Sequence, residues 1–213
     1  MNLRNSILVL LLALFASSDL AAQGTIDRRF RFAPIVGLNV SQVDGDTLAG
    51  FVMPGLQLGG RAYAMLDDKG RTSLSIGILY NQKGSRSTRS LFRQRLNYAD
   101  IPILFNYHDK DRVIMTGGIS VGRLVGAITR DRTGAINEEA DDAFRQWDYN
   151  YVFASTFLVR RQLGITLQYS GSLAPITDGP SLRPNGKGQI NRTITFGASW
   201  IFGGPGWNDD PEE

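Results

Sequence analysis

The single histidine of the chain, His108, is the first place to look for nucleophilic catalysis. A serine hydrolase needs a serine within hydrogen-bonding distance of the imidazole and a third group that orients the ring. Asp109 is adjacent in sequence, but both residues are expected in a tight turn, and Ser73 and Ser75 are only loosely near the same end of a neighbouring segment. We therefore expect no catalytic residues and no enzymatic activity.

Metal and nucleotide sites are also poorly supported. Asp44 and Asp46 flank a glycine and could take part in a calcium site, but two carboxylates without further spaced oxygen ligands equally fit a turn. Gly117, Gly118 and Gly122 follow the spacing of a strand and not that of a phosphate-binding loop. We expect neither a metal ion nor a cofactor.

A second group of charged residues falls on the polar faces of segments that alternate between polar and apolar residues: Arg61, Lys83, Asp100 and Asp148. If these faces line the interior of a small barrel, the charges lie in a space just wide enough for side chains. Two interpretations remain open. The residues form a network of salt bridges and hydrogen bonds that fills the bore, or they line a narrow gated path for ions or a small solute.

Segment 84–95 is rich in arginine, and its basic residues are Arg86, Arg89, Arg93 and Arg95. Guanidinium groups bind phosphate with two parallel hydrogen bonds. If this segment is an extracellular loop, Arg86, Arg89 and Arg93 are expected to contact lipid phosphates of the outer leaflet. The alternative is a solvated basic loop that pairs with the acidic segment 138–142.

The elements that must position these residues are strands. Eight segments place apolar residues at every second position and small or polar residues between them, which is the pattern of a strand with one apolar and one polar face. These segments are Phe32–Gln42, Gly55–Leu66, Thr72–Lys83, Leu96–Tyr107, Val113–Val125, Asp148–Val159, Gln162–Leu173 and 190–202.

The connections between these segments alternate in length. Long connections cover 43–54, 84–95, 126–147 and 174–189, whereas short ones cover 67–70, 108–111 and 160–161. Bacterial outer-membrane barrels have short periplasmic turns and long external loops. The pattern predicts an all-β fold, an eight-stranded antiparallel up-and-down transmembrane β-barrel with both termini in the periplasm. The alternative is a soluble periplasmic lipocalin-like binding protein, in which the apolar faces would point inward.

Aromatic residues mark the predicted ends of the strands. Tyr107, Trp200 and Phe202 are expected in the aromatic girdle where the barrel wall meets the membrane surface. The aromatic end of the last strand also resembles the signal read by the barrel-assembly machinery, although the eleven-residue tail 203–213 follows it.

The first 22 residues have the features of a secretory signal peptide: Arg4, a short apolar core, and small residues ending at Ala22. The remaining residues, 23–213, are expected to form one barrel domain with a short periplasmic C-terminal tail. The chain has 24 glycines, which suit tight turns, and no cysteine, so disulfides cannot stabilise it. Its net charge of +3 is spread along the chain and does not suggest a nucleic-acid partner.

Segment 96–107, with Tyr98, Asp100 and Pro102, resembles the Tyr-x-acidic-Ile-Pro-Leu-Leu strand of the PorT-like outer-membrane β-barrel proteins of Bacteroidetes. Other parts of the chain, 36–42, 51–60 and 115–122, are similar to further strands of that family. The resemblance implies a barrel in the bacterial outer membrane. From the signal peptide, the eight strands and their connections we expect this barrel to have a structural or interaction role. Its expected partners are outer-membrane lipid and an envelope protein.

Overall fold

The computed structural model describes residues 30–44, 50–87, 92–109, 112–130, 133–137, 144–160, 162–177 and 188–203. The predicted signal peptide and most of the C-terminal tail lie outside these ranges. The long strands are β1 (Phe30–Asp44), β2 (Met53–Met65), β3 (Thr72–Arg86), β4 (Arg93–Asp109), β5 (Val113–Arg130), β7 (Trp147–Leu158), β8 (Leu163–Ser172) and β9 (Ile190–Trp200). A two-residue strand, β6 (Ile136–Asn137), pairs with the end of β5. Among the described residues, no helix is long and apolar enough to cross a membrane.

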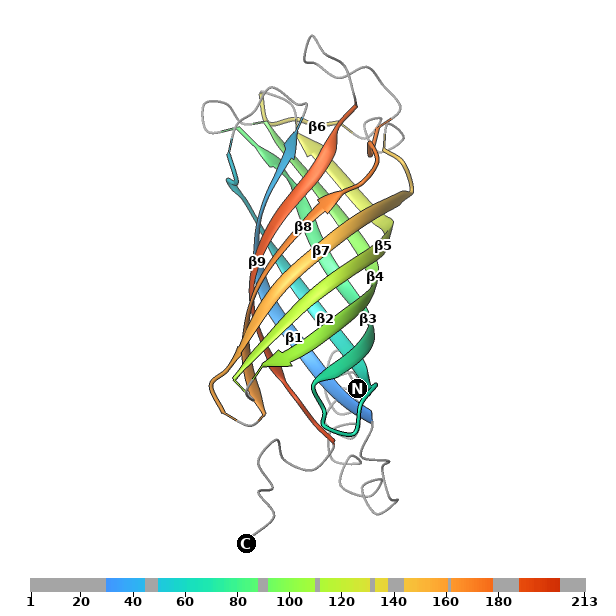
Figure 1. Cartoon of the computed structure of the whole chain (residues 1–213). Coiled ribbons are helices and arrows are strands. Elements are labelled where there is room, and N and C mark those ends of the chain that lie inside the picture. Colours follow the sequence, from blue (N-terminus) through green and yellow to red (C-terminus); the bar gives the residue numbers. More distant parts are fainter. Residues whose placement is uncertain are drawn as a thin grey trace, which may run out of the picture.

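The eight long strands form a closed antiparallel barrel, which confirms the predicted fold. The last strand pairs with the first, so β1 (blue) and β9 (red) lie side by side in Figure 1. When cross-strand partners are followed once round the barrel from Phe32, the path returns to β1 at Gln42, ten residues further along. A stagger of this kind tilts the strands by about 40° to the barrel axis.

The outer wall is apolar and the interior is polar. In β9, Phe196 is 60% exposed on the outer wall, whereas Thr195 is 2% exposed in the interior. The outward side chains of β1 remain mostly apolar from Phe30 to Val40, and ten residues of a tilted strand rise about 25 Å, the height of the apolar band of outer-membrane barrels. The predicted strand faces are confirmed. The lipocalin-like alternative is wrong, because it requires the opposite arrangement.

One predicted long connection is short in the structure. Segment 84–95 was expected to be a loop, but β3 continues to Arg86 and β4 begins at Arg93, which leaves six residues between them. The outward-facing residues at these ends of β3 and β4 are polar. The alternation of apolar and polar residues therefore ends there, although the backbone hydrogen bonds between the two strands continue. The inward side chains Ser85 and Gln94 stay buried. The alternation of long and short connections is therefore not strict.

Two other strand ends also differ from the prediction. β5 extends to Arg130, five residues beyond the expected end at Val125. At the opposite end of the barrel, His108 belongs to β4 and not to a turn, and its side chain points inward with 4% exposure. The connections β2–β3, β4–β5 and β7–β8 lie at this end, which we call the turn end; the other is the loop end (Figure 1).

Pro102 lies in the middle of β4, and a residue without an N–H is normally found within a sheet only at an edge, a bulge or an opening of the ladder. Between β3 and β4 the pairings of Gly77 and Ile78 with Pro102 and Ile101 are absent, and the same register resumes on either side. The ladder is therefore open on the β3 side of Pro102. The register shift of β4 is elsewhere, after Asn97 and on the side of β5.

Candidate functional site

The interior of the barrel is built in three layers. Two are apolar clusters of inward-facing residues, one at each end of the barrel. The turn-end plug consists of Ala33, Tyr63, Ile114 and Ile201, and the loop-end plug consists of Val43, Leu96, Tyr98, Ala127 and Ile176. Ile176 comes from the connection between β8 and β9, where its N–H donates to the carbonyl of Gln189 at 2.7 Å. Between the plugs the inward side chains are mostly polar.

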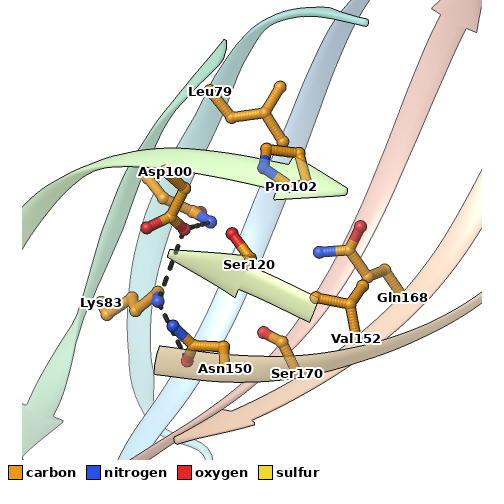
Figure 2. Close-up of a pocket in the computed structure, with 10 residues that line it drawn as sticks. Leu79, Lys83, Asp100, Pro102, Ser120, Asn150, Val152, Gln168 and Ser170 are labelled. Atoms are coloured by element: carbon orange, nitrogen blue, oxygen red, sulfur yellow. Dashed lines mark hydrogen bonds and ion pairs between the residues drawn. The ribbon is translucent and has the colours of Figure 1, made fainter. Parts of the chain in front are cut away.

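On the loop-end side of this polar layer, beside Leu96 of the loop-end plug, Lys83 bridges two carboxylates and forms a charged centre with them. Its Nζ lies 3.4 Å from Asp100 Oδ2 and 3.2 Å from Asp148 Oδ2, and Lys83 is 1% exposed. It also donates to Asn150 Oδ1 at 3.4 Å, as Figure 2 shows, and lies 4.8 Å from the ring centroid of Tyr98. The structure thus brings together three of the four charged residues selected from the sequence.

A chain of amide hydrogen bonds extends from this centre across the junction of the first and last strands. The Nδ2 of Asn81 donates to Asp100 Oδ2 at 2.8 Å, and the Nδ2 of Asn39 donates to Asn81 Oδ1 at 2.7 Å. The hydroxyl of Thr195 then donates to Asn39 Oδ1 at 2.7 Å. Asn39 and Thr195 are direct cross-strand neighbours on β1 and β9. This chain therefore connects the charged centre to the seam of the barrel.

The network returns to β9 through Asn191. Its Nδ2 donates to Asp148 Oδ2 at 3.0 Å and reaches the hydroxyl of Tyr98 at 3.5 Å. Strands β1, β3, β4, β7 and β9 are then joined by one set of side chains centred on Lys83. Because buried charges are costly unless they are paired and hydrogen-bonded, this arrangement suits a structural core more than an open water path.

Arg61 lies apart from this centre. It is buried on β2, where its cross-strand partners are Ala33 and Gly77. Gly77 is six residues from Lys83 along β3, a separation of about 20 Å. Within the described residues the structure gives Arg61 no ion pair.

A small cavity adjoins the network at the opening in the ladder beside Pro102. Its walls include Lys83, Asp100, Ser120 and Asn150 (Figure 2), and its volume is about 10 Å³. A space of this size holds about one water molecule. The cavity is too small for an organic ligand.

Ser73 and His108 are closer than the sequence indicated. Ser73 Oγ lies 3.0 Å from His108 Nε2, because β4 extends far enough to bring the imidazole beside β3. The expectation that the two are only loosely near one another is wrong. Both are buried, with Ser73 at 0% and His108 at 4% exposure, so the serine is not accessible to a substrate.

The arginines expected in a loop lie on strands. Arg86 at the end of β3 is the direct cross-strand neighbour of Arg93 at the start of β4, and Arg93 is the neighbour of Arg130 on β5. Arg89 and the acidic segment 138–142 lie outside the described residues.

The candidate calcium ligand Asp44 has a protein partner. Its Oδ2 forms an ion pair with Arg192 Nε at 2.9 Å, and Gln42 donates a hydrogen bond to its Oδ1. Asp46 lies outside the described residues. In the part of the chain that the structure describes, no group of three or more histidine, cysteine or acidic residues could hold a metal ion.

The three residues expected in the aromatic girdle lie on the outer wall at the turn end. Tyr107, Trp200 and Phe202 are 46%, 42% and 50% exposed. The main chain of Phe202 pairs with that of Phe32 through two hydrogen bonds of 2.9 and 2.7 Å, which extends the β1–β9 seam to the end of the barrel.

Comparison with known proteins agrees with this architecture. Residues 15–178 match the family model described as outer membrane protein beta-barrel domain. The attachment invasion locus protein Ail of Yersinia pestis has a similar fold, with a TM-score of 0.51, 13% identity, and coverage of 82% of this chain and 99% of that one. The complex of Ail with the heparin analogue sucrose octasulfate gives a TM-score of 0.50 and 12% identity, with coverage of 82% of this chain and 99% of that one. Neisserial surface protein A gives a TM-score of 0.48, 9% identity, and coverage of 81% and 97%. No curated protein matches the chain.

Three findings identify the kind of protein: the apolar outer wall, the closed eight-stranded sheet and the family match. The match covers more than half of the chain. The protein is an integral β-barrel of the bacterial outer membrane, and the chain belongs to the outer membrane protein beta-barrel domain family.

Proposed function

We propose that the protein is a sealed, non-catalytic barrel whose role in the outer membrane is structural or in interaction with other envelope components. The observation that carries this proposal is the plugged interior. An ion crossing the barrel would have to pass the turn-end plug, the ion-paired centre and the loop-end plug, all built from buried side chains. The cavity between them holds about one water molecule.

The proposed orientation places the turn end in the periplasm and the loop end outside the cell. Support comes from the usual asymmetry of outer-membrane barrels and from the longer connections β5–β7 and β8–β9 at the loop end. In this orientation outer-membrane lipid surrounds the wall, and an envelope protein partner would bind the exposed ends. The barrel-assembly machinery is the partner proposed during insertion.

The PorT-like assignment is a finer proposal within the family. The strongest resemblance, in segment 96–107, covers β4, whose Tyr98 and Asp100 belong to the central network and whose Pro102 opens the ladder. Tyr98, Asp100 and Pro102 are interior residues, whereas Ile101 and Ile103 of the same motif lie on the outer wall. These residues support a shared barrel core and do not identify an external partner.

Single-channel recording in planar lipid bilayers tests the sealed barrel. The protein is refolded, and its folded state is verified by the difference in gel migration between heated and unheated samples. A bilayer without steady conductance is the expected result. A steady unit conductance that changes in Lys83→Met or Asp100→Asn would refute the proposal and would favour the narrow ion path.

A further inference from the structure

Four arginines gather on the outer wall at the loop end, and we call them the arginine rim: Arg86, Arg93, Arg95 and Arg130. Arg86 and Arg130 are exposed, whereas Arg93 and Arg95 are half-buried. All four point outward, because the side chains that alternate with them are buried in the interior, namely Ser85, Gln94, Leu96 and Thr129. The rim spans three neighbouring strands.

Among the residues that the structure describes, this arrangement is unfavourable. Arg93 lies directly opposite Arg86 on one side and Arg130 on the other, and like charges in such positions destabilise a sheet. In the described part of the chain none of the four forms an ion pair with an acidic group. The Nε atoms of Arg93 and Arg95 are buried and have no hydrogen-bond partner among the described residues. An anion supplied from outside would relieve both the repulsion and the unsatisfied donors.

The height of the rim indicates where that anion lies. On β4 the outward positions change from Tyr107, Phe105, Ile103 and Ile101 near the turn end to Arg95 and Arg93 at the loop end. Twelve residues separate Tyr107 from Arg95, which on a strand tilted by about 40° is a rise of about 30 Å. The apolar band of such barrels is about 25 Å tall. The rim therefore lies just above the apolar band and on the same lipid-facing wall.

From this position we propose that the arginine rim binds the phosphate groups of an anionic lipid in the outer leaflet. The ligand is an amphiphile because the charged rim and the apolar wall below it are continuous along the same strands. Guanidinium groups match phosphate oxygens with paired hydrogen bonds. A lipid with two phosphate groups fits four guanidinium groups better than a lipid with one. The proposal rests on the orientation given above, and it adds Arg95 and Arg130 to the residues expected from the sequence.

The test measures how lipid composition changes the stability of the refolded protein. Wild-type protein and a variant with all four rim arginines changed to glutamine are placed in phosphatidylcholine vesicles, with and without 10 mol% (about one lipid in ten) of a lipid that carries two phosphates, cardiolipin. The expected result is that cardiolipin shifts the unfolding equilibrium of the wild type at least about tenfold towards the folded state, and that the rim variant loses most of this shift. The matched control changes four exposed basic residues at the turn end to glutamine: Lys69, Arg71, Arg112 and Arg160.

Three outcomes would overturn the proposal. The rim variant could keep the whole effect of cardiolipin, or the turn-end control could lose as much of it as the rim variant. Inorganic pyrophosphate added to protein in phosphatidylcholine alone could also give the same stabilisation, which would indicate a site for a soluble anion and not for a lipid. If the rim variant does not fold, the single variants Arg93→Gln and Arg95→Gln are compared in the same way. This readout is independent of conductance, so its failure is distinguishable from failure of the sealed-barrel proposal.

Discussion

Replacement of Lys83 by methionine is the most direct perturbation of the barrel interior. Methionine has a similar length but no charge, so Lys83→Met removes the cation that bridges Asp100 Oδ2 and Asp148 Oδ2 at 3.4 and 3.2 Å. Both carboxylates then remain buried, at 3% and 1% exposure. Among the described residues, the other oxygen of each carboxylate, Oδ1, already has no hydrogen-bond partner.

The expected cost follows from the burial of these charges. Removal of one partner from a buried ion pair costs about 3–5 kcal/mol, because the remaining charge is left uncompensated. Lys83 has two such partners, so the free energy of unfolding should fall by at least about 3 kcal/mol. This value corresponds to a change of more than about a hundredfold in the unfolding equilibrium constant. A variant that also carries Asp100→Asn and Asp148→Asn contains no buried charge at the centre and should recover most of the loss.

The assay is urea or guanidinium unfolding in lipid vesicles, in which the folded fraction is measured by gel migration of unheated samples. Lys69→Met removes an exposed lysine from the β2–β3 turn and is the matched control, with an expected change below about 0.5 kcal/mol. If Lys83→Met unfolds at the same denaturant concentration as the wild type, the ion pairs do not stabilise the barrel. If the triple variant is as unstable as Lys83→Met, the loss comes from packing and not from charge.

Two further predictions use the same assay. An added Cβ at Gly122 would clash with Asp100 Oδ1, so Gly122→Ala should displace that carboxylate and cost about 1–3 kcal/mol. At Gly117 the nearest atoms are 3.7 Å away, and Gly117→Ala should change stability by less than about 0.5 kcal/mol; equal stability of the two variants would contradict the reasoning. Ser73→Ala removes the partner 3.0 Å from His108 Nε2 and should cost about 1–3 kcal/mol. If Ser73→Ala and the wild type are half unfolded at the same denaturant concentration, this hydrogen bond contributes nothing to stability.

The strand faces could be predicted from the sequence because they depend on local alternation. In β9, for example, Phe196 and Thr195 lie on opposite sides of the wall as the alternating pattern requires. The strand ends could not be predicted in the same way. Beyond the apolar band, towards the loop end, the outward residues of β3, β4 and β5 include arginines. The alternation that marks a strand therefore disappears, although the hydrogen-bonded ladder continues to Arg86 and Arg130.

The residues of the central network could be selected individually, but their contacts could not. Lys83 and Asp148 are 65 residues apart in sequence, and they meet only because the closed sheet has a stagger of ten residues. Nothing local in the sequence specifies that stagger. Tyr98 could have been placed in the interior, because it is two residues from Asp100 and therefore on the same face of β4. The sequence pattern places His108 in a turn, so it does not predict the contact of His108 with Ser73.

The interior residues and the barrel seam depend on one another. The bond from Thr195 to Asn39 crosses the β9–β1 junction, and through Asn81 and Asp100 it reaches the lysine that also holds Asp148 on β7. A chain without cysteine has no disulfide to close its first strand onto its last, so closure depends on the main-chain ladder and on side-chain bonds of this kind. Substitution of these interior residues should therefore disturb the closure of the sheet.

Closure of the sheet does not depend on the arginine rim. Among the described residues its guanidinium groups repel one another and form no ion pair. At that height on the wall the nearest abundant anion outside the chain is a lipid phosphate, the group proposed above to lie against the rim.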